Sequence, residues 1–320
     1  MKVVTADDVD RFFTFDAVID ALRDAFVAGA NAPLRHRHTI ERGDGGEATL
    51  LLMPAWSHDA ANGWIGVKIV TVTPQNREAN LPAVMASYLL MDGNTGTPKL
   101  MVDGAALTVW RTSCASALAA RYLAPRNPDT LLVVGAGELA PFMARAHVSV
   151  RDYRRVLVWN RSPGAAEKLA AMLSKDGLDA SAAGNLDAAV AEADVITAAT
   201  LSREPLIKGS LLKPGAHVDL VGAFSPDMRE SDDECVRRAS IFVDTYEGAI
   251  KEGGDLAQPL ASGVLAREAV KADLHELCSG AHAGRQSDDE ITLFKSTGAA
   301  LEDLAAAILA AGLAAESKDA

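Results

Sequence analysis

The chain has 320 residues, 49% of them hydrophobic, and a formal net charge of −12 at pH 7. The length suits two domains, since a domain usually holds about 100–200 residues, and the negative charge argues against nucleic acids and anionic membranes as partners. Acids occur within the first ten residues and no long apolar run is present, so we expect neither a signal peptide nor a transmembrane helix. The three scattered cysteines favour reduced thiols in a cytoplasmic protein, and neither they nor the histidines show the spacing of a metal site.

The first third of the chain predicts a helix followed by a sheet with hairpins. Apolar residues recur at helical spacing over 9–28. Further along, turn signals such as Asn62-Gly63 separate apolar runs of strand length. The expected strands are 50–54, 65–73, 83–92 and 99–103.

Basic residues interrupt this apolar region at three places. Arg35 lies in the basic stretch 35–38, which we interpret as an exposed loop. Lys68 lies inside an apolar strand, where a lysine without a partner is rare, and Arg111 lies near the start of a long helix expected over 106–123. The three cations could converge on one small carboxylate, for which arginine offers bidentate geometry. Alternatively, Lys68 extends to solvent and Arg35 is a surface residue.

Beyond Pro125 the chain alternates between strands and helices, which is typical of a parallel, doubly wound sheet of the Rossmann type. The expected strands are 131–134, 155–159, 195–199, 218–222 and 241–244. The expected helices include 141–150, 165–174, 186–193 and a last one over 297–314. Pro125 and Pro128 mark the expected domain boundary.

The segment 131–140 carries the clearest functional signal, because an apolar strand runs into a Gly-x-Gly-x-x-Ala turn and then a helix. Gly135 permits the tight turn, Gly137 lets the main chain approach a pyrophosphate, and Ala140 lets helix and strand pack closely. Free N–H groups at the start of the helix would bind the phosphates. An ordinary strand-to-helix turn is the alternative. The expected dinucleotide contacts here are Gly135, Ala136, Gly137, Glu138 and Leu139.

The end of the next strand favours NADPH over NADH. Many NAD enzymes place an acid here for the ribose 2′-hydroxyl, whereas this chain has Asn160, Arg161 and Ser162, which suit a 2′-phosphate. A solvated loop arginine is the alternative interpretation, and NADH stays a second candidate. The run of small residues at 197–200 could let the cofactor lie close to the sheet, which adds Ala199 and Thr200 to the expected contacts.

Short motifs follow one another in a fixed order along nearly the whole chain. They include Pro33-x-Arg35, Leu52-Met53-Pro54-Ala55, Val67-Lys68, Leu107-Thr108-x-x-Arg111-Thr112, Gly135-Ala136-Gly137, Trp159-Asn160-Arg161, Val221-Gly222-Ala223, Pro226-Asp227-x-Arg229-Glu230 and Phe294-Lys295-Ser296-x-Gly298. This order resembles that of the ornithine cyclodeaminase/mu-crystallin family. The resemblance implies a Rossmann domain over 123–295 and an α+β substrate and dimerisation domain built from 1–122 and 296–320, in a homodimer.

The resemblance also implies roles for individual residues. Arg35, Lys68 and Arg111 would bind the substrate carboxylate, and Lys68 and Arg111 are the catalytic candidates. Lys68 could also act near the substrate nitrogen, since a desolvated lysine has a lowered pKa. Met53 would be a further substrate contact. Thr112, Val221 and Ser296 would lie at the cofactor.

Phe224 distinguishes among the activities of the family. Its cyclodeaminases and alanine dehydrogenases carry an aspartate at this position, and a phenyl ring cannot transfer a proton. Ketimine reductases similar to mu-crystallin lack that acid. The resemblance therefore implies NAD(P)H-dependent reduction of cyclic ketimine carboxylates, 1-pyrroline-2-carboxylate to L-proline and 1-piperideine-2-carboxylate to L-pipecolate, as part of proline metabolism.

Two alternatives stay open. One is an ornithine cyclodeaminase or alanine-type dehydrogenase whose acid has moved to Asp219 or Asp227. The other is a non-catalytic protein that binds NADPH and a small ligand. The three cations argue against the second alternative, because a simple nucleotide-binding protein does not need them.

Overall fold

The computed structural model describes residues 1–43, 46–79 and 81–316, and the chain forms two compact units. Unit 1 comprises Met1–Arg111 and Ala299–Ala320, and unit 2 comprises Thr112–Gly298. The division falls inside helix α3 (Gly104–Leu123), earlier than the sequence-based boundary at 122/123. The prolines that suggested that boundary only follow the end of the helix. Packing changes earlier, because Arg111 bonds to residues of unit 1 and Ser116 bonds to Asp219 of unit 2.

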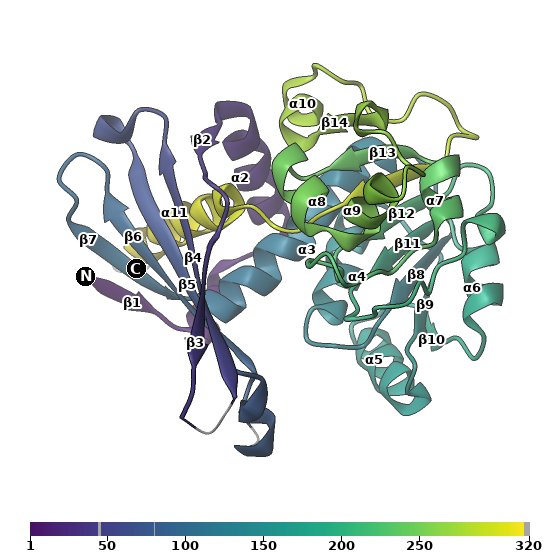
Figure 1. Cartoon of the computed structure of the whole chain (residues 1–320), viewed down its shortest axis with the longest axis horizontal. Coiled ribbons are helices and arrows are strands. Elements are labelled where there is room, and N and C mark those ends of the chain that lie inside the picture. Colours follow the sequence, from purple (N-terminus) through teal and green to yellow (C-terminus); the bar gives the residue numbers. More distant parts are fainter. Residues whose placement is uncertain (44–45, 80, 317–320) are drawn as a thin grey trace. The chain divides into compact units, whose positions relative to one another are not determined.

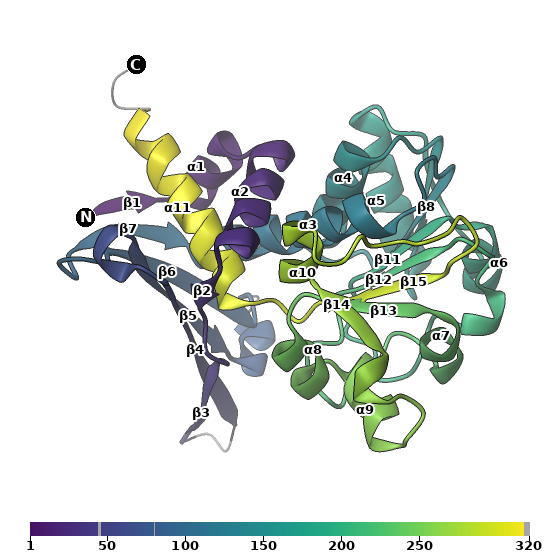
Figure 2. The same cartoon turned by 90° about the horizontal axis from the view of Figure 1, so that it is seen from above.

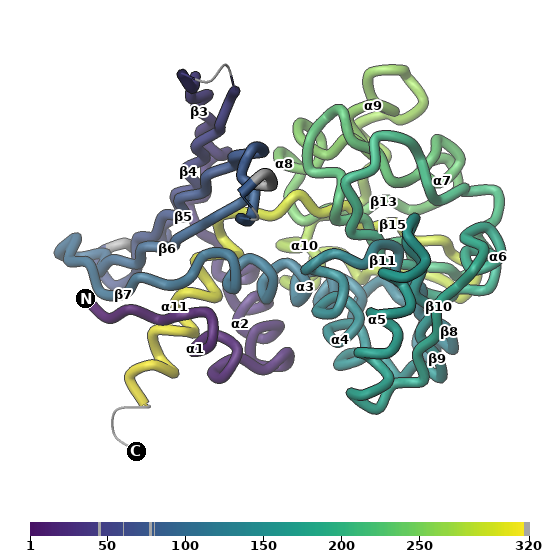
Figure 3. The backbone as a smooth tube through the Cα atoms, turned by 90° about the horizontal axis from the view of Figure 1, so that it is seen from below, coloured from purple at the N-terminus to yellow at the C-terminus, as the bar shows by residue number. Residues whose placement is uncertain are grey.

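Unit 1 is a seven-stranded sheet in the order β1-β7-β6-β5-β4-β2, with β3 paired to β4. Both ends of the chain belong to it, as the N-terminal strand and the C-terminal helix show in Figure 3. The strands are β1 (Lys2–Val4), β2 (Ala30–Asn31), β3 (His36–Glu41), β4 (Glu47–Ser57), β5 (Trp64–Val72), β6 (Val84–Asp92) and β7 (Pro98–Asp103).

Helices α1 (Ala6–Phe12), α2 (Phe15–Ala28) and α11 (Ala300–Glu316) complete unit 1 (Figure 2). Helix α11 packs against β4, β5 and β6 and so covers one face of the sheet. Strand residues alternate between faces, and the covered face includes Met53, Lys68 and Tyr88, which are paired across neighbouring strands and are all buried.

Two predictions for this region are wrong. The single helix over 9–28 is two helices, because Phe13 is extended and the Thr14 side chain accepts a hydrogen bond from Ala17 N to begin α2. The basic stretch 35–38 is not a loop, since it leads into strand β3, whose residues pair with Glu47–Leu52 of β4. Its alternation of Arg and His is consistent with a strand that is exposed on both faces.

Unit 2 is an eight-stranded parallel sheet in the order β10-β9-β8-β11-β12-β15-β13-β14 (Figure 1). This confirms the predicted Rossmann-type fold. The strands are β8 (Thr130–Val134), β9 (Arg155–Trp159), β10 (Ala180–Ala182), β11 (Val195–Ala198), β12 (His217–Leu220), β13 (Ser240–Val243), β14 (Val270–Asp273) and β15 (Thr292–Lys295). The helices are α4 (Ala140–Val150), α5 (Pro163–Lys175), α6 (Leu186–Glu192), α7 (Asp233–Arg238), α8 (Tyr246–Glu252), α9 (Gly254–Ala261) and α10 (Leu274–Ser279).

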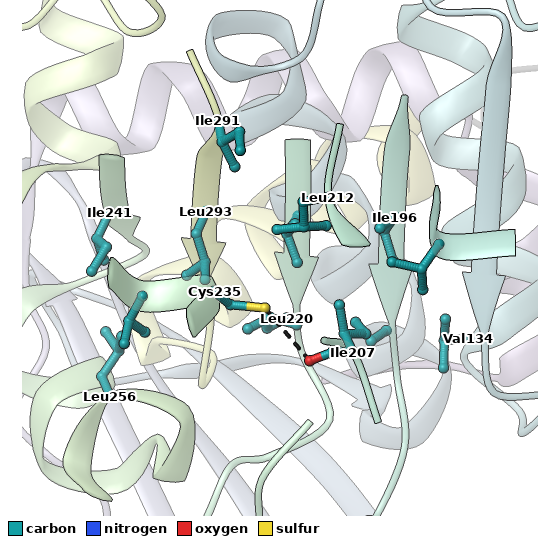
Figure 4. Packing of buried hydrophobic residues seen from close by; sticks show 14 of the residues in the cluster. Val134, Ile196, Ile207, Leu212, Leu220, Cys235, Ile241, Leu256, Ile291 and Leu293 are labelled. Carbon is teal, nitrogen blue, oxygen red and sulfur yellow. Dashed lines mark hydrogen bonds between the residues drawn. The ribbon is translucent and has the colours of Figure 1, made fainter. Parts of the chain in front are cut away.

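Strand β8, in the middle of this sheet, is buried on both faces, which explains why its sequence is almost continuously apolar. On β8, Leu131 and Val133 belong to one hydrophobic cluster, and Leu132 and Val134 belong to another. Figure 4 shows the second cluster, in which side chains from β11, β12, β15 and β13 form one layer. Cys235 lies in this layer and its thiol donates to the Ile207 carbonyl at 3.5 Å.

Candidate active site

Unit 1 contains a buried cluster of charged side chains at the predicted carboxylate-binding residues. Lys68 is 2% exposed, and its Nζ lies 2.9 Å from Asp303 of α11 and 3.3 Å from the Thr108 hydroxyl. Arg111 donates from Nε to Asp303 at 2.9 Å and from Nη1 to Glu302 at 2.7 Å. Lys68 and Arg111 thus meet at one carboxylate, and Lys68 does not extend to solvent.

The electrostatics of the cluster connect all three predicted cations. Burial lowers the pKa of Lys68 to about 8, and the charge of Asp303 opposes this, while the charges of Arg111 and Arg35 lower it further. Burial raises the pKa of Asp303, but the charges of Lys68 and Arg111 outweigh burial and hold it below its usual value. Arg35 is half-buried and lies near enough to act on Lys68.

The acids of this cluster, Glu302 and Asp303, were not identified from the sequence. Both are fully buried near the start of α11. A signal was present, because they form an acidic pair in a helix that is otherwise almost entirely alanine and leucine.

Two uncharged side chains lie beside Lys68 on the covered face of the sheet. Met53 pairs with Lys68 across β4 and β5, and Tyr88 pairs with it across β5 and β6. The Tyr88 hydroxyl is buried without a hydrogen-bond partner in the described part of the chain. Burial, and then the charge of Asp303, raise the Tyr88 pKa well above its usual value, so the hydroxyl stays protonated. Met53 was expected at the site, whereas Tyr88 was not.

Unit 2 has a groove of about 280 Å³ at the carboxyl ends of three neighbouring strands. Ligands bind at this edge in open α/β sheets. Seven of the expected cofactor contacts line the groove: Gly135, Ala136 and Gly137 after β8, Asn160 and Arg161 after β9, and Ala199 and Thr200 after β11. Trp159, Leu201, Ser202 and Leu206 line it too and were not predicted.

The glycine turn has the geometry that a bound pyrophosphate requires. Gly135 has a φ of +112°, and a Cβ there would lie 2.7 Å from the Ala199 carbonyl oxygen. A Cβ on Gly137 would meet no atom of the chain within 4 Å, so the main chain is open to a ligand at this point. Helix α4 begins without a side-chain cap at Leu139. The Ala140 N–H bonds to the Gly137 carbonyl at 3.1 Å and Pro141 has no N–H, so the N–H groups placed to meet a phosphate are those of Glu138 and Leu139 in the turn. The turn therefore fits a dinucleotide.

The other expected cofactor residues do not line the groove. Glu138 and Leu139 belong to the turn itself, and Ser162 precedes α5 and accepts from the Asn160 amide through its carbonyl. Thr112, Val221 and Ser296 are buried. The Ser296 hydroxyl donates to Asp244 at 3.0 Å.

The two candidates for a relocated acid differ in their surroundings. Asp219 is fully buried and accepts from Ser116 at 2.9 Å and Thr197 at 2.7 Å, and it also pairs with His147. Asp227 is exposed and pairs with Arg203 at 3.1 Å. Phe224 is 45% exposed.

The described residues contain no group of three or more His, Cys, Asp or Glu side chains able to hold a metal ion. Cys114, Cys235 and Cys278 are free thiols. Over the same ranges, each helix is too short or too polar to cross a bilayer.

Comparison with known proteins identifies the family. Residues 1–317 match the model of the ornithine cyclodeaminase/mu-crystallin family. The Δ1-pyrroline-2-carboxylate reductase of Colwellia psychrerythraea is 34% identical over 312 residues, which cover 96% of this chain and 97% of that protein.

Two solved structures have the same fold. One is the Δ1-pyrroline-2-carboxylate reductase of Thermococcus litoralis in complex with NADH and L-proline, with a TM-score of 0.92, 34% identity and coverage of 99% of this chain and 98% of that one. The other is an archaeal alanine dehydrogenase dimer with bound NAD, with a TM-score of 0.90, 31% identity and coverage of 99% of this chain and 96% of that one. The resemblance seen in the sequence is confirmed, and the chain belongs to the ornithine cyclodeaminase/mu-crystallin family.

Proposed function

We propose that this protein uses NAD(P)H to reduce cyclic ketimine carboxylates, 1-pyrroline-2-carboxylate to L-proline and 1-piperideine-2-carboxylate to L-pipecolate. The observation that carries the proposal is the buried cluster of Lys68 and Arg111 with two acids, with half-buried Arg35 near enough to act on Lys68, in a chain that also has a dinucleotide groove. The similarity to two-domain reductases of this substrate class supports it.

The residues of unit 1 bind and orient the substrate. Arg111 uses two nitrogens for its acids, which fixes the plane of its guanidinium group before the carboxylate arrives. Asp303 keeps Lys68 protonated against burial, so Lys68 pairs with the carboxylate at neutral pH and holds a proton near the imine nitrogen. Met53 and Tyr88 add an apolar wall and a neutral hydroxyl.

The residues of unit 2 bind the dinucleotide. Bound reduced nicotinamide supplies the hydride that, with a proton, converts the C=N bond into CH–NH. The N–H groups of Glu138 and Leu139 at the start of α4 bind the pyrophosphate. Asn160, Arg161 and Ser162 favour NADPH, because the groove has a cation and no acid among its lining residues. NADH is the second cofactor. Thr112, Val221 and Ser296 shape the site from buried positions.

The second face of the sheet in unit 1 suits a homodimer. Across β1, β4, β5, β6 and β7 this face presents apolar side chains to solvent. The most exposed are Val3, Trp56, Ile69, Met85 and Met101, at 36% to 59%. An apolar patch of this kind marks a protein–protein contact. The free thiols are consistent with a cytoplasmic setting.

The test is the rate of NADPH oxidation by the purified protein with 1-pyrroline-2-carboxylate, with proline identified as the product. Parallel assays with NADH, and with ornithine plus NAD, test the cofactor preference and the deaminase alternative. Lys68→Met is expected to raise KM for the imine, and thermal unfolding of the variant shows whether the loss comes from binding or from the fold. Oxidation of NADPH no faster with the imine than without it contradicts the proposal.

A further inference from the structure

A buried carboxylate joins two loops beside the groove of unit 2. Glu230 is fully buried in the segment between β12 and α7. Its Oε1 accepts from the Thr200 N–H at 2.7 Å and the Thr200 hydroxyl at 2.8 Å. Its Oε2 accepts from the N–H groups of Gly222 at 2.7 Å and Ala223 at 3.2 Å. Thr200 follows β11 and Gly222 follows β12, so one side chain ties consecutive loops at the carboxyl edge of the sheet. We call this arrangement the Glu230 clamp.

The clamp sets the position of the groove wall. A Cβ on Gly222 would lie 2.0 Å from the Thr200 carbonyl oxygen and 2.2 Å from its nitrogen, so the two main chains are in direct contact. Thr200 and Ala199 line the groove. A shift of the loop after β12 is therefore transmitted to the residues that face the dinucleotide.

Two further buried charged residues, Asp255 and Lys295, lie beside the clamp. Asp255 of α9 accepts from the main-chain N–H of Glu230 at 2.8 Å and lies 3.2 Å from the Lys295 ammonium of β15. Burial raises the pKa of Glu230 to about 7; the charge of Lys295 lowers it and that of Asp255 raises it. When Glu230 is ionised, both oxygens accept from the loops. When it is protonated, one oxygen becomes a donor facing N–H groups, and bonds of the clamp are lost.

We propose that Glu230 is a positioning residue for the dinucleotide, whose ionised carboxylate holds the loops after β11 and β12 in the arrangement that binds it. The inference rests on the proposed function, since it takes the groove as the dinucleotide site. The clamp opens as Glu230 takes up a proton. The affinity for the dinucleotide therefore falls as the pH falls through neutrality.

Calorimetric titration of the whole protein with NAD⁺ tests this. NAD⁺ is the probe because NADP⁺ carries a 2′-phosphate, and a phosphate monoester itself titrates with a pKa of about 6. The wild-type Kd is expected to rise about tenfold as the pH falls from about 8 to about 6. Glu230→Gln directs an amide NH₂ at the N–H groups of one loop. The Kd of this variant for NAD⁺ at about pH 8 is therefore expected to be about tenfold to a hundredfold higher than that of the wild type, and to be independent of pH.

Asp194→Asn is the matched control. The Asp194 carboxylate also ties two segments, accepting from the N–H groups of Asp129 and Thr130, both at 2.8 Å, but at the amino edge of the same sheet. This variant is expected to keep the wild-type Kd and its pH profile. Thermal unfolding of both variants separates a loss of fold from a loss of binding.

Each other outcome counts against the proposals. A folded Glu230→Gln protein with the wild-type Kd, or with the wild-type pH dependence, overturns the inference. If that variant does not fold, a wild-type Kd that is constant across the pH range overturns it. If the wild type binds NADP⁺ but not NAD⁺, the same comparison of wild type and Glu230→Gln is made with NADP⁺, and equal Kd values overturn the inference alone. A wild-type protein that binds neither NAD⁺ nor NADP⁺ overturns the proposed function and the inference together.

Discussion

Lys68 combines burial with a functional charge, and its ionisation should control the binding of a carboxylate. Its pKa of about 8 lies below that of free lysine, so the ammonium is charged at neutral pH and loses its proton as the pH rises through that value. Pyrrole-2-carboxylate is a suitable probe, because its ring nitrogen does not titrate in this range. Its inhibition constant is expected to rise about tenfold for each pH unit above the Lys68 pKa.

Lys68→Arg is the control for this prediction. An arginine stays charged across the whole range. The alkaline rise in the inhibition constant should therefore disappear in the variant, whatever its affinity at neutral pH. A rise that persists in Lys68→Arg would assign the titration to another group.

Asp303 supports both cations of the cluster, and its removal should be costly for the fold. Asp303→Asn keeps the shape of the side chain but leaves Lys68 and Arg111 in a buried site with less compensating charge. Breaking a buried pair in this way costs about 3–5 kcal/mol of unfolding free energy. Urea unfolding measures the loss.

The exposed pair between Arg145 and Asp176 gives the comparison. It has a similar separation of 2.7 Å, but its side chains are 32% and 38% exposed. Asp176→Asn is expected to cost less than about 1 kcal/mol, because solvent screens the pair. Equal losses of unfolding free energy in the two variants would contradict the conclusion that Asp303 stabilises the fold by pairing with two buried cations.

At the scale of the element, the two glycines in the turn between β8 and α4 have different roles: Gly135 is required by the fold of the turn, and Gly137 leaves space for the ligand. Gly135→Ala places a Cβ against the Ala199 carbonyl at a positive φ, so it should cost about 1–3 kcal/mol of stability and also weaken NAD⁺ binding. Gly137→Ala meets no atom of the chain, so its stability should stay within about 0.5 kcal/mol while NAD⁺ binding still weakens. Thermal unfolding and calorimetry distinguish the two. Unimpaired NAD⁺ binding by Gly137→Ala would place the pyrophosphate elsewhere.

The elements predictable from the sequence are those with a strong local pattern. The apolar run and glycine turn at 131–140 gave β8 and the start of α4 almost to the residue. Strand β15 was missed as a strand although it lies between β12 and β13, because its run of four residues is short and its pairing joins segments distant in sequence. The exposed strand β3 has no apolar alternation to reveal it.

The site was predictable only in part for the same reason. Cations in apolar surroundings are visible in the sequence, as Lys68 was. Their partners depend on which helix covers the sheet, and Asp303 lies 235 positions away from Lys68. The Glu230 clamp could not be predicted either, because its hydrogen bonds join two loops that meet only in the folded sheet.

At the scale of the whole molecule, unit 1 has one covered and one uncovered sheet face, and we expect the uncovered face to form the homodimer. Ile69 lies in the middle of that face on β5 and is 40% exposed, while its neighbours Lys68 and Val70 point to the buried side. Ile69→Glu places a charge in the expected interface and leaves the cation cluster untouched. It should convert the dimer to a monomer in analytical ultracentrifugation.

Met172→Glu is the matched control for the dimer prediction. Met172 is 47% exposed on α5 of unit 2, so the same change at similar exposure tests surface charge without touching the sheet face. This variant is expected to sediment as the wild type does. A monomeric wild type, or a dimer that survives Ile69→Glu, would show that the exposed apolar side chains of β5 do not form the contact. NAD⁺ affinity should be unchanged in both variants, because neither residue lines the groove.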